Sequence, residues 1–490
     1  MEKRMKSRTN SGIDNRNDNR NDKRSNNRIV DTAQQRWVLM ATCLSYVIVI
    51  LDTSIVNLAL ERIGMDLAGG VSGLQWVLNA YTLTFASLLL TGGTLGDRLG
   101  ARNVYIAGLA CFMVASTLCA CAPGLPMLIA ARSLQGGGAA LLVPASMTLI
   151  SHTWTGSRER AAVFGLWAGL GGIAMASGPL LGGMLVGFTG WRSIFLANVP
   201  ICMAAMVLAL RVGRAAPFER AGAAARKFDF AGQAAGIAAL GLLNVLVIDV
   251  PAYGWQPPLA VGALAAGVIF VVIETMCAQP MLPMNLFRQP LFAGGVFVSM
   301  VSAFTFYGLL FELSLLLQRQ QGYTPMQAGL AFLPLTLPVP VGSLLSKRAL
   351  GRFGAKCLVT GACLLSAAGF FGLAGVGAAA PYALLALPLP AIGLAASLIT
   401  PATTATLMSA VEDRRAGIAA GVLNAARQVG AALGVAWCGT LLSASHAIAR
   451  GMHMSAMAAG ALSIAAAVVW WHGAAERAPA RQSMGPRVND

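Results

Sequence analysis

Fourteen apolar stretches follow one another between residues 36 and 472, and they constrain the fold more than any other feature of the chain. Each is close to the ~20 residues that an α-helix needs to cross a bilayer. Charged residues make up only 11% of the 490 residues, whereas soluble domains carry about 25%. The ~10-residue alternating segments of a transmembrane β-barrel are missing. The sequence therefore predicts an all-α integral membrane protein with 14 transmembrane helices.

Composition narrows the possible ligands. The 55 glycines suit helices that pack closely in lipid. The nine cysteines lie mostly inside apolar stretches, where we interpret them as small packing residues, and no metal-ligand spacing is present. The net charge of +16 comes mainly from short segments between the stretches. We therefore expect a lipid-embedded protein with no metal and no nucleic-acid partner.

Basic residues set the expected orientation. Most of the 35 Lys and Arg residues lie in the N-terminal tail and in every second connection between the stretches. Such segments face the cytoplasm under the positive-inside rule, which places both termini there. The first apolar run begins near Trp37 and is too long for a cleaved signal. We expect a multi-pass protein of the cytoplasmic (inner) membrane.

The chain repeats itself at a nearly constant spacing. RLGAR at 98–102 matches RFGAK at 352–356, and AALLVPA at 139–145 matches AASLITPA at 395–402. Parallel six-helix halves are a recurring transporter plan, but here the spacing covers eight stretches, so two helices are inserted. The predicted domains are a disordered cytoplasmic tail (1–35), an N-terminal six-helix bundle (36–211), a basic cytoplasmic connector (212–228), two inserted helices (229–276), a C-terminal six-helix bundle (291–472) and a cytoplasmic tail (473–490).

Four of the charged residues within the predicted spans are candidates for function, since each such charge costs about 2.5–3.5 kcal/mol to insert. Asp52 and Arg132 lie at similar depths, which predicts that they pair. Glu312 gives the second half a carboxylate at a comparable height, and Arg427 is the fourth charge. Our hypothesis is that Asp52 and Glu312 bind and release protons, with Arg132 as electrostatic partner. A static ion pair or a charge snorkelling to the interface is the alternative.

Two glycine-rich segments carry further candidate residues. The first, GTLGDRLGAR, predicts a tight cytoplasmic turn in which Asp97 favours a helix N-terminus or an ion pair that opens and closes. The second, GPLLGG, lies in the outer half of its span and combines a helix-kinking proline with glycines that allow close contact with a neighbouring helix. It could therefore close the outer half of the bundle. A purely topological or structural role is the alternative for each. The candidates are Gly93, Gly96, Asp97, Arg98, Gly100 and Arg102 as a cytoplasmic gate motif, and Gly178, Pro179, Gly182 and Gly183 in the second segment.

With these residues identified, the chain resembles the major facilitator superfamily, specifically its fourteen-helix drug:proton antiporter branch of the multidrug, quaternary-ammonium efflux type. LDTSIVNLAL at 51–60, GTLGDRLGAR at 93–102, RSLQGGGAA at 132–140 and SGPLLGG at 177–183 resemble that branch's motifs in the right order. The resemblance implies two six-helix bundles with two inserted central helices. It also implies proton coupling by Asp52 and Arg132, gating around Asp97, and export marked by the fifth-helix antiporter motif.

The chain departs from the family pattern at a few positions. Ala101 replaces a usual basic residue, and Ala174 replaces a usual glycine of the antiporter motif. Some relatives carry acidic residues in span thirteen that recognise divalent cations, whereas this chain has Asn424 and Arg427 there. Dicationic substrates are therefore not expected.

The expected function is proton-driven export of amphipathic drugs or toxic compounds by alternating access, with no cofactor. Partners would be a small-molecule substrate and protons, and the oligomeric state stays open between a monomer and an assembly with a periplasmic adaptor. An alternative is a narrow exporter of one metabolite or self-made antibiotic. An enzyme is disfavoured because no nucleophile or metal cluster is visible, and an ATP-driven pump because no G-x-x-x-x-G-K-[ST] occurs.

A mid-membrane site for amphipathic substrates needs aromatic faces with a few polar groups, and cationic substrates gain from cation–π contact. Packing in the core or against lipid is the alternative for each aromatic residue. Besides Asp52 and Glu312, the predicted lining residues are Asn57, Trp76, Tyr81, Gln135, Trp167 and Phe306.

Overall fold

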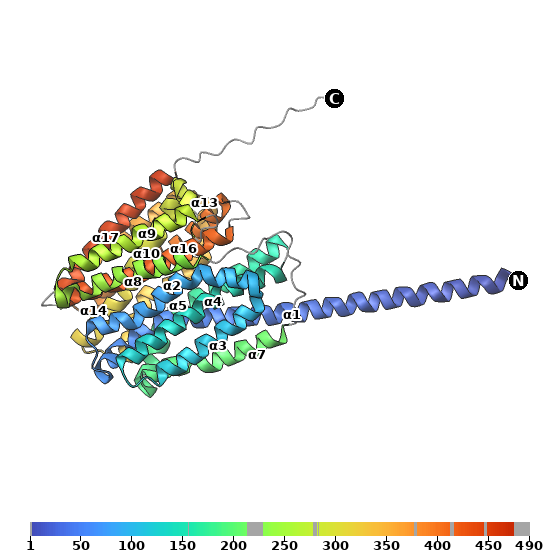
Figure 1. Ribbon diagram of the computed structural model, residues 1–490, viewed down its shortest axis with the longest axis horizontal. Helices are drawn as coiled ribbons and strands as arrows, with labels where there is room; N and C mark the ends of the chain where they lie inside the picture. The colour runs from blue at the N-terminus through green and yellow to red at the C-terminus, as the bar shows by residue number, and fades with distance from the viewer. Residues whose placement is uncertain are drawn as a thin grey trace, which may run out of the picture.

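The computed structural model describes residues 2–154, 156–212, 229–277, 282, 284–376, 380–411, 416–444 and 448–474. All regular elements in these ranges are helical, and the long helices run side by side as one elongated bundle (Figure 1). Thirteen helical segments among the described residues are long and apolar enough to cross a membrane. The predicted all-α membrane architecture is confirmed.

One of the thirteen segments supplies two crossings. It covers Pro325–Ala374, whose 50 residues would extend about 75 Å as a straight helix, more than twice the ~30 Å of a bilayer core. The segment comprises α11 (Pro325–Ala331), α12 (Leu333–Thr336) and α13 (Pro338–Ala374), and α13 breaks at Gly354, where φ is +72°. The described residues therefore contain fourteen crossings.

A glycine with positive φ makes the corresponding turn in each half of the chain. Gly100 joins α2 (Val71–Leu99) to α3 (Ala101–Ala120) with a φ of +88°, and Gly354 occupies the matching position of the repeat. Positive φ favours glycine because a Cβ atom would clash with the backbone. We call this end of the bundle the Gly100 end and the opposite end, where α1 stops, the Asp66 end.

The first bundle has α4 at its centre. Helices α2 and α3 both pack closely on α4, and Gly136 permits this because a methyl group there would lie 2.3 Å from the carbonyl oxygen of Tyr81. Short α6 and α7 together form the sixth crossing. The remaining elements are α1 (Glu2–Asp66), α4 (Leu125–Thr153), α5 (Ser157–Thr189), α6 (Arg192–Leu196) and α7 (Asn198–Arg211).

The second bundle begins after a short 3₁₀ turn. Its helix α10 packs mainly on α16, and α13 packs on α15 and α17. A π-helical turn, η2, ends the first crossing of this bundle. The remaining elements are η1 (Met284–Arg288), α10 (Pro290–Leu315), η2 (Leu316–Gln320), α14 (Tyr382–Ala386), α15 (Leu389–Ala410), α16 (Ala416–Ala444) and α17 (Ile448–Gly473).

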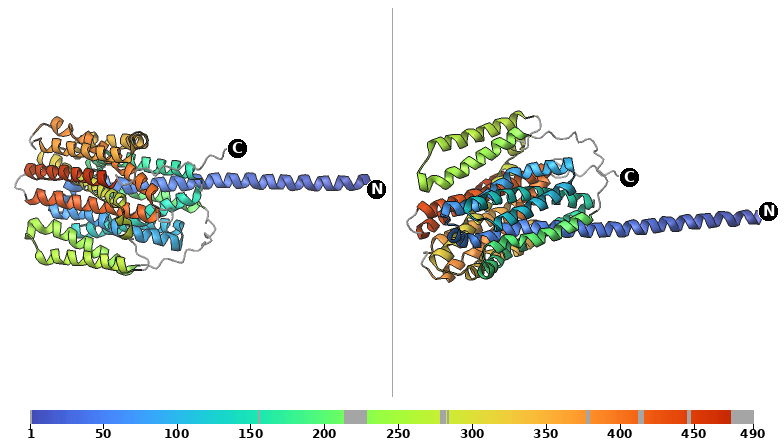
Figure 2. Two further views of the ribbon diagram at one scale, coloured as in Figure 1. Left: turned by 90° about the horizontal axis from the view of Figure 1, so that it is seen from above. Right: turned by 60° about the horizontal axis from the view of Figure 1, so that its bottom comes forward.

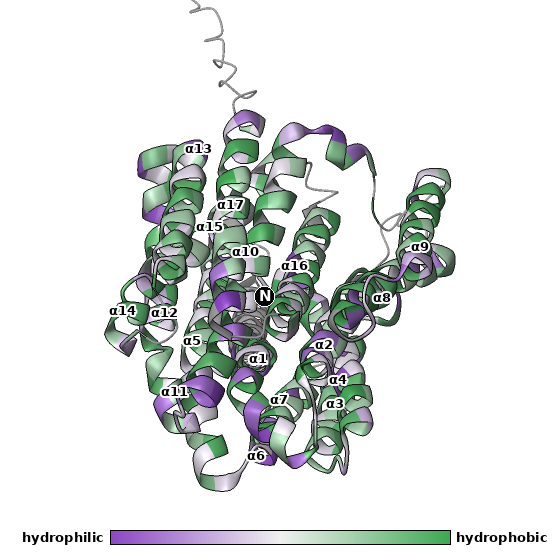
Figure 3. Cartoon of the chain, turned by 90° about the vertical axis from the view of Figure 1, so that its left-hand side faces the viewer, coloured by the Kyte–Doolittle hydropathy of each residue, from purple (hydrophilic) through white to green (hydrophobic). Residues whose placement is uncertain are grey.

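The inserted helices α8 (Phe230–Tyr253) and α9 (Pro257–Met276) stand at one edge of the bundle (Figure 2). Helix α8 contacts α2 and α16, whereas α9 packs on α8 and presents an apolar surface outward (Figure 3). The Gln233 amide donates to the Ser87 carbonyl at 2.7 Å, and Thr440 Oγ1 donates to the Val247 carbonyl at 2.6 Å. The pair therefore flanks both bundles without entering either core.

The predicted tail differs from the structure. Helix α1 runs without interruption from Glu2, so residues 2–35 extend the first crossing beyond the bundle instead of forming a disordered segment (Figure 1). An α-helix satisfies its backbone hydrogen bonds within itself, so it can continue without tertiary contacts. The predicted connector (212–228), apart from Val212, and the C-terminal tail beyond residue 474 lie outside the described residues.

Replacing Gly354 with Ala tests the turn. The positive φ is strained for alanine, so Gly354→Ala should lower the free energy of unfolding by about 1–2 kcal/mol. Gly351→Ala is the matched control, because Gly351 has open space and a helical backbone, and alanine there should stabilise by about 0.5–1 kcal/mol. Chemical unfolding in detergent measures both, and a change of equal sign and size would contradict the prediction.

Candidate functional site

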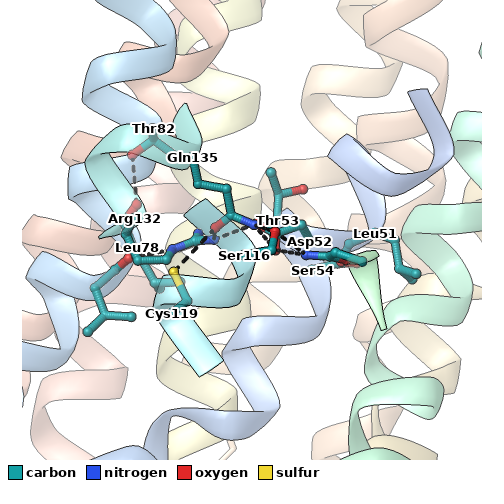
Figure 4. A network of polar contacts seen from close by, with 12 residues as sticks. Leu51, Asp52, Thr53, Ser54, Leu78, Thr82, Ser116, Cys119, Arg132 and Gln135 are labelled. Atoms are coloured by element: carbon teal, nitrogen blue, oxygen red, sulfur yellow. Dashed lines mark hydrogen bonds and ion pairs between the residues drawn. The ribbon is translucent and has the colours of Figure 1, made fainter. Parts of the chain in front are cut away.

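A buried ion pair lies inside the first bundle. Asp52 on α1 and Arg132 on α4 meet with 2.5 Å between Oδ2 and Nη1 (Figure 4). Their side chains are 0% and 1% exposed. The predicted pairing of these two residues is confirmed.

Neutral polar side chains complete the surroundings of the carboxylate. Gln135 Nε2 donates to Asp52 Oδ1 at 2.9 Å and to Ser116 Oγ (Figure 4). Asn198 Nδ2 donates to the same two oxygens, at 3.0 Å to Asp52 Oδ1. Arg132 Nη1 also donates to Gln135 Oε1 at 2.7 Å. A buried pair needs such additional bonds to offset desolvation. Gln135, predicted to line a substrate site, lies in this network.

Arg132 also reaches the boundary between the bundles. Its Nε donates to the Val77 carbonyl of α2 at 3.0 Å, and its guanidinium carbon lies 4.4 Å from the centre of the Tyr81 ring. A cation at this distance is attracted to the aromatic face. Arg132 therefore links the ion pair to Tyr81.

A small cavity lies beside Tyr81, between the two bundles. Its volume of about 10 Å³ has room for about one water molecule, whereas drug-sized ligands need about 300–1,000 Å³. The site is therefore contracted in this conformation. The lining residues are Thr53, Asn57, Leu78, Tyr81, Thr82 and Arg132 from the first bundle and Tyr307, Ala431 and Val435 from the second.

Two of the predicted substrate residues, Asn57 and Tyr81, line this cavity, whereas the other predicted aromatic residues lie outside its lining. Trp167 stacks on Tyr46 with ring centres 3.5 Å apart, and Phe306 packs edge-on against Tyr307 at 5.8 Å. Trp76 is half-buried and outside the lining.

Sequence reasoning missed four polar residues here. Gln75 Nε2 donates to the Ala436 carbonyl of α16 at 2.7 Å, and Tyr307 lines the cavity. Ser116 and Asn198 hold the ion pair. A polar side chain in an apolar stretch was the available signal for each, because such groups are costly in lipid without a partner.

Glu312 is buried in the second bundle away from the cavity lining. Ser455 Oγ on α17 donates to Glu312 Oε2 at 2.6 Å, while Oε1 has no hydrogen-bond partner. Among the described residues, Glu312 forms no ion pair. The second bundle thus holds an uncompensated carboxyl group, in contrast to Asp52.

The bundles are joined at the Asp66 end. Glu61 on α1 forms an ion pair with Arg319 of η2, and Ser314 Oγ donates to the Asn57 carbonyl at 2.5 Å. Gln318 Nε2 donates to the Leu58 carbonyl at 3.3 Å. These three contacts connect α1 with the end of α10, so this end is closed.

The GPLLGG segment contributes to the same closure. A methyl group at Gly183 would lie 2.5 Å from the Pro325 carbonyl oxygen, and one at Gly329 would lie 2.6 Å from that of Pro179. On the opposite side of α5, Gly178 and Gly182 lie against α1. Glycine is therefore required where α5 passes between α1 and α11.

In the GTLGDRLGAR segment the chain turns at Gly100 alone, because residues 93–99 belong to α2 and Ala101 begins α3. The tight turn predicted for the whole segment is therefore confined to this glycine. Arg102 donates to the carbonyls of Ala209 and Leu210 at 3.2 and 3.1 Å, and a cation is favourable at the C-terminus of a helix. A methyl group added at Gly93 would lie 3.9 Å from Pro144, and one added at Gly96 would have no other atom within 4 Å. Asp97 and Arg98 both have interaction partners, and gating by this segment stays a prediction.

Removing Arg132 should leave Asp52 buried without compensation. Arg132→Met should lower the free energy of unfolding by about 3–5 kcal/mol, and adding Asp52→Leu should recover much of the loss. Arg192→Met is the control, because Arg192 pairs with Asp66 at 3.8 Å on the surface and is 43% exposed; its cost should be about 0–1 kcal/mol. Additive losses in the double variant, measured by chemical unfolding in detergent, would contradict the prediction.

Enlarging Gly183 should open the Asp66 end. The side chain in Gly183→Val would overlap the backbone of α11, so hydrogen–deuterium exchange should rise in residues 314–330. Gly187→Val is the control, because Gly187 lies one turn away on the same helix and a methyl group there would have no other atom within 4 Å. In that control, exchange in residues 314–330 should remain as in the wild type. Equal exchange in both variants would show that the close approach of α5 and α11 at Gly183 does not close this end.

Comparisons with known proteins agree with this geometry. The family model for the Major Facilitator Superfamily matches residues 42–435. The chain is 37% identical over 442 residues to the methylenomycin A resistance protein of Bacillus subtilis (strain 168), covering 88% of this chain and 93% of that protein. It is 36% identical over 411 residues to the multidrug resistance protein Stp of Mycobacterium tuberculosis (strain CDC 1551 / Oshkosh), covering 83% and 75%.

Among solved structures, the nucleoside transporter NupG superposes with a TM-score of 0.64 at 12% identity, covering 89% of this chain and 99% of that one. At this identity the likeness concerns the fold. The extent of the family match and the identity to the two relatives decide the assignment. This chain is a multi-pass membrane protein that belongs to the Major Facilitator Superfamily.

Proposed function

We propose that this protein exports amphipathic drugs or toxic compounds across the cytoplasmic membrane in exchange for protons, by alternating access. The names of its relatives, a methylenomycin A resistance protein and a multidrug resistance protein, support drug export. The proton gradient would supply the energy without a cofactor, and one chain would suffice for transport.

The orientation follows from the basic residues. With the Gly100 end in the cytoplasm, the turns RLGAR and RFGAK face inward. The Asp66 end, which the Glu61–Arg319 pair and the GPLLGG segment close, then faces outward. The described conformation would therefore be closed to the outside.

One observation carries the proposal of proton coupling. Arg132 belongs both to the buried pair with Asp52 and to the lining of the cavity between the bundles. A proton arriving on Asp52 would remove the charge that holds Arg132, and Arg132 would then shift against Tyr81 and the Val77 carbonyl. Proton binding and the shape of the substrate site would change together.

Glu312 would serve as a second proton site. Its carboxyl group is buried with Ser455 as its neighbour and without a paired cation. A buried charge without a partner is costly, so exchange of a proton there would require access to water. Opening of the bundles during transport would provide that access.

A narrow exporter of one antibiotic or metabolite is the second candidate. The name of the Bacillus relative refers to a single antibiotic, and six of the nine residues that line the contracted cavity carry polar side chains, which suits recognition of one compound. Resistance to one compound only, when the protein is expressed in a sensitive host, would favour this candidate over multidrug export.

Replacing Asp52 tests the coupling. In inverted vesicles, addition of ethidium, followed by a panel of antibiotics, should dissipate an imposed pH gradient through the wild type. Asp52→Asn should abolish this response, because the amide cannot exchange the proton. Asp249→Asn makes the same change on α8 at the edge of the bundle and should retain the response. Substrate-dependent dissipation through folded Asp52→Asn would eliminate Asp52 as the coupling residue.

A further inference from the structure

The mechanism proposed above assigns no role to Arg427. This residue lies on α16, and its guanidinium is held against α15 by neutral acceptors. Nη1 donates to Asn424 Oδ1 at 3.1 Å, and Nη2 donates to Thr404 Oγ1 at 2.5 Å and to the Thr400 carbonyl at 3.2 Å. Nε has no hydrogen-bond partner. The side chain is thus fixed in place while part of its donor capacity is unused.

No carboxylate in the described part of the chain forms an ion pair with this cation. Among the described residues, ion pairs join Arg132 to Asp52, Arg192 to Asp66 and Arg319 to Glu61. Arg427 lies about 16 Å along α16 from its start at Ala416, at 1.5 Å per residue, which is near the middle of a ~30 Å bilayer core. A side chain at this depth cannot reach the interface by snorkelling, so the charge has to be satisfied inside the protein.

The surroundings of Arg427 belong to the space between the bundles. Ala425, two residues earlier on α16, packs against the hydrophobic core of the first bundle, as Tyr46 on α1 does. Tyr46 is stacked on Trp167, and Tyr307 lines the cavity. Ala431, one turn further along α16, lines the same cavity. Arg427 therefore lies between Ala425 and Ala431, on the part of α16 that borders the space between the bundles.

We propose that Arg427 binds the acidic group of the exported compound, so that the preferred substrates are amphipathic weak acids bearing a carboxylate, phenolate or enolate. This inference rests on the proposed export function. A planar guanidinium suits a carboxylate because it offers paired donors, and the ring of Tyr307, which lines the cavity, offers an aromatic surface for the rest of the molecule.

The two carboxylates favour the same substrate charge. Asp52 is saturated by Arg132, Gln135 and Asn198, and Glu312 is buried outside the cavity lining. Neither offers a free negative charge to a cationic drug in this conformation. Tyr81 is one of the aromatic rings expected to contact cationic amphiphiles, but the Arg132 guanidinium already lies over its face.

Three probes with one ring system test the proposal. 1-Naphthoate, 1-naphthamide and 1-naphthylmethylammonium differ in charge at pH 7 but share their apolar part. Calorimetric titration of the purified full-length protein should show that naphthoate binds about tenfold to a hundredfold more tightly than naphthamide, as expected for a hydrogen bond to a charged group. In Arg427→Gln this preference should disappear while the affinity for naphthamide remains.

Two further variants separate binding from folding. Arg427→Lys keeps the charge without the planar fork and should retain part of the preference. Arg192→Gln removes a surface charge and should retain all of it. A wild-type protein without preference for naphthoate overturns the proposal whatever the variants do, and so does an undiminished preference in folded Arg427→Gln.

Transport of the same probes distinguishes this inference from the proposed function. If inverted vesicles export naphthamide or naphthylmethylammonium in a proton-dependent manner but show no preference for naphthoate, the acidic-substrate proposal fails and drug export stands. If no probe or antibiotic dissipates the pH gradient, both proposals fail together. Preferential export of naphthoate that is lost in Arg427→Gln supports both.

Discussion

The buried ion pair between Asp52 and Arg132 is the interaction on which the first bundle depends. Two charges inside apolar helices are tolerated only when each is compensated, and here α1 and α4 provide the charges while α3 and α7 provide Ser116 and Asn198. The pair therefore fixes four helices relative to one another. Because Arg132 also contacts Tyr81 at the bundle boundary, a change in the pair is transmitted to the cavity.

At the Asp66 end, the two bundles meet where small residues allow backbones to approach. Gly183 meets Pro325, Gly329 meets Pro179, and polar side chains of η2 and α10 donate to carbonyls of α1. Van der Waals contact and hydrogen bonds drive helix association in lipid, since burial of apolar surface offers no gain there. Such contacts can be separated at moderate cost, as the proposed alternating access would require.

Much of this architecture could be predicted from local patterns. Span length and hydropathy predicted fourteen crossings, the repeated RLGAR and RFGAK predicted matching turns, and equal depth predicted the Asp52–Arg132 pair. The aromatic residues were harder, because Trp167 and Phe306 pack on Tyr46 and Tyr307. A lone sequence does not say which face of an apolar helix meets lipid, its own bundle or the other bundle.

The sequence by itself determined the membrane class, the two related halves and the few charged residues that had to be compensated. Only the tertiary structure decided how each charge is satisfied: Arg132 by a carboxylate and Arg427 by Asn424, Thr404 and a carbonyl. The physical reason is that hydropathy depends on each residue alone, whereas compensation of a charge depends on which helices become neighbours.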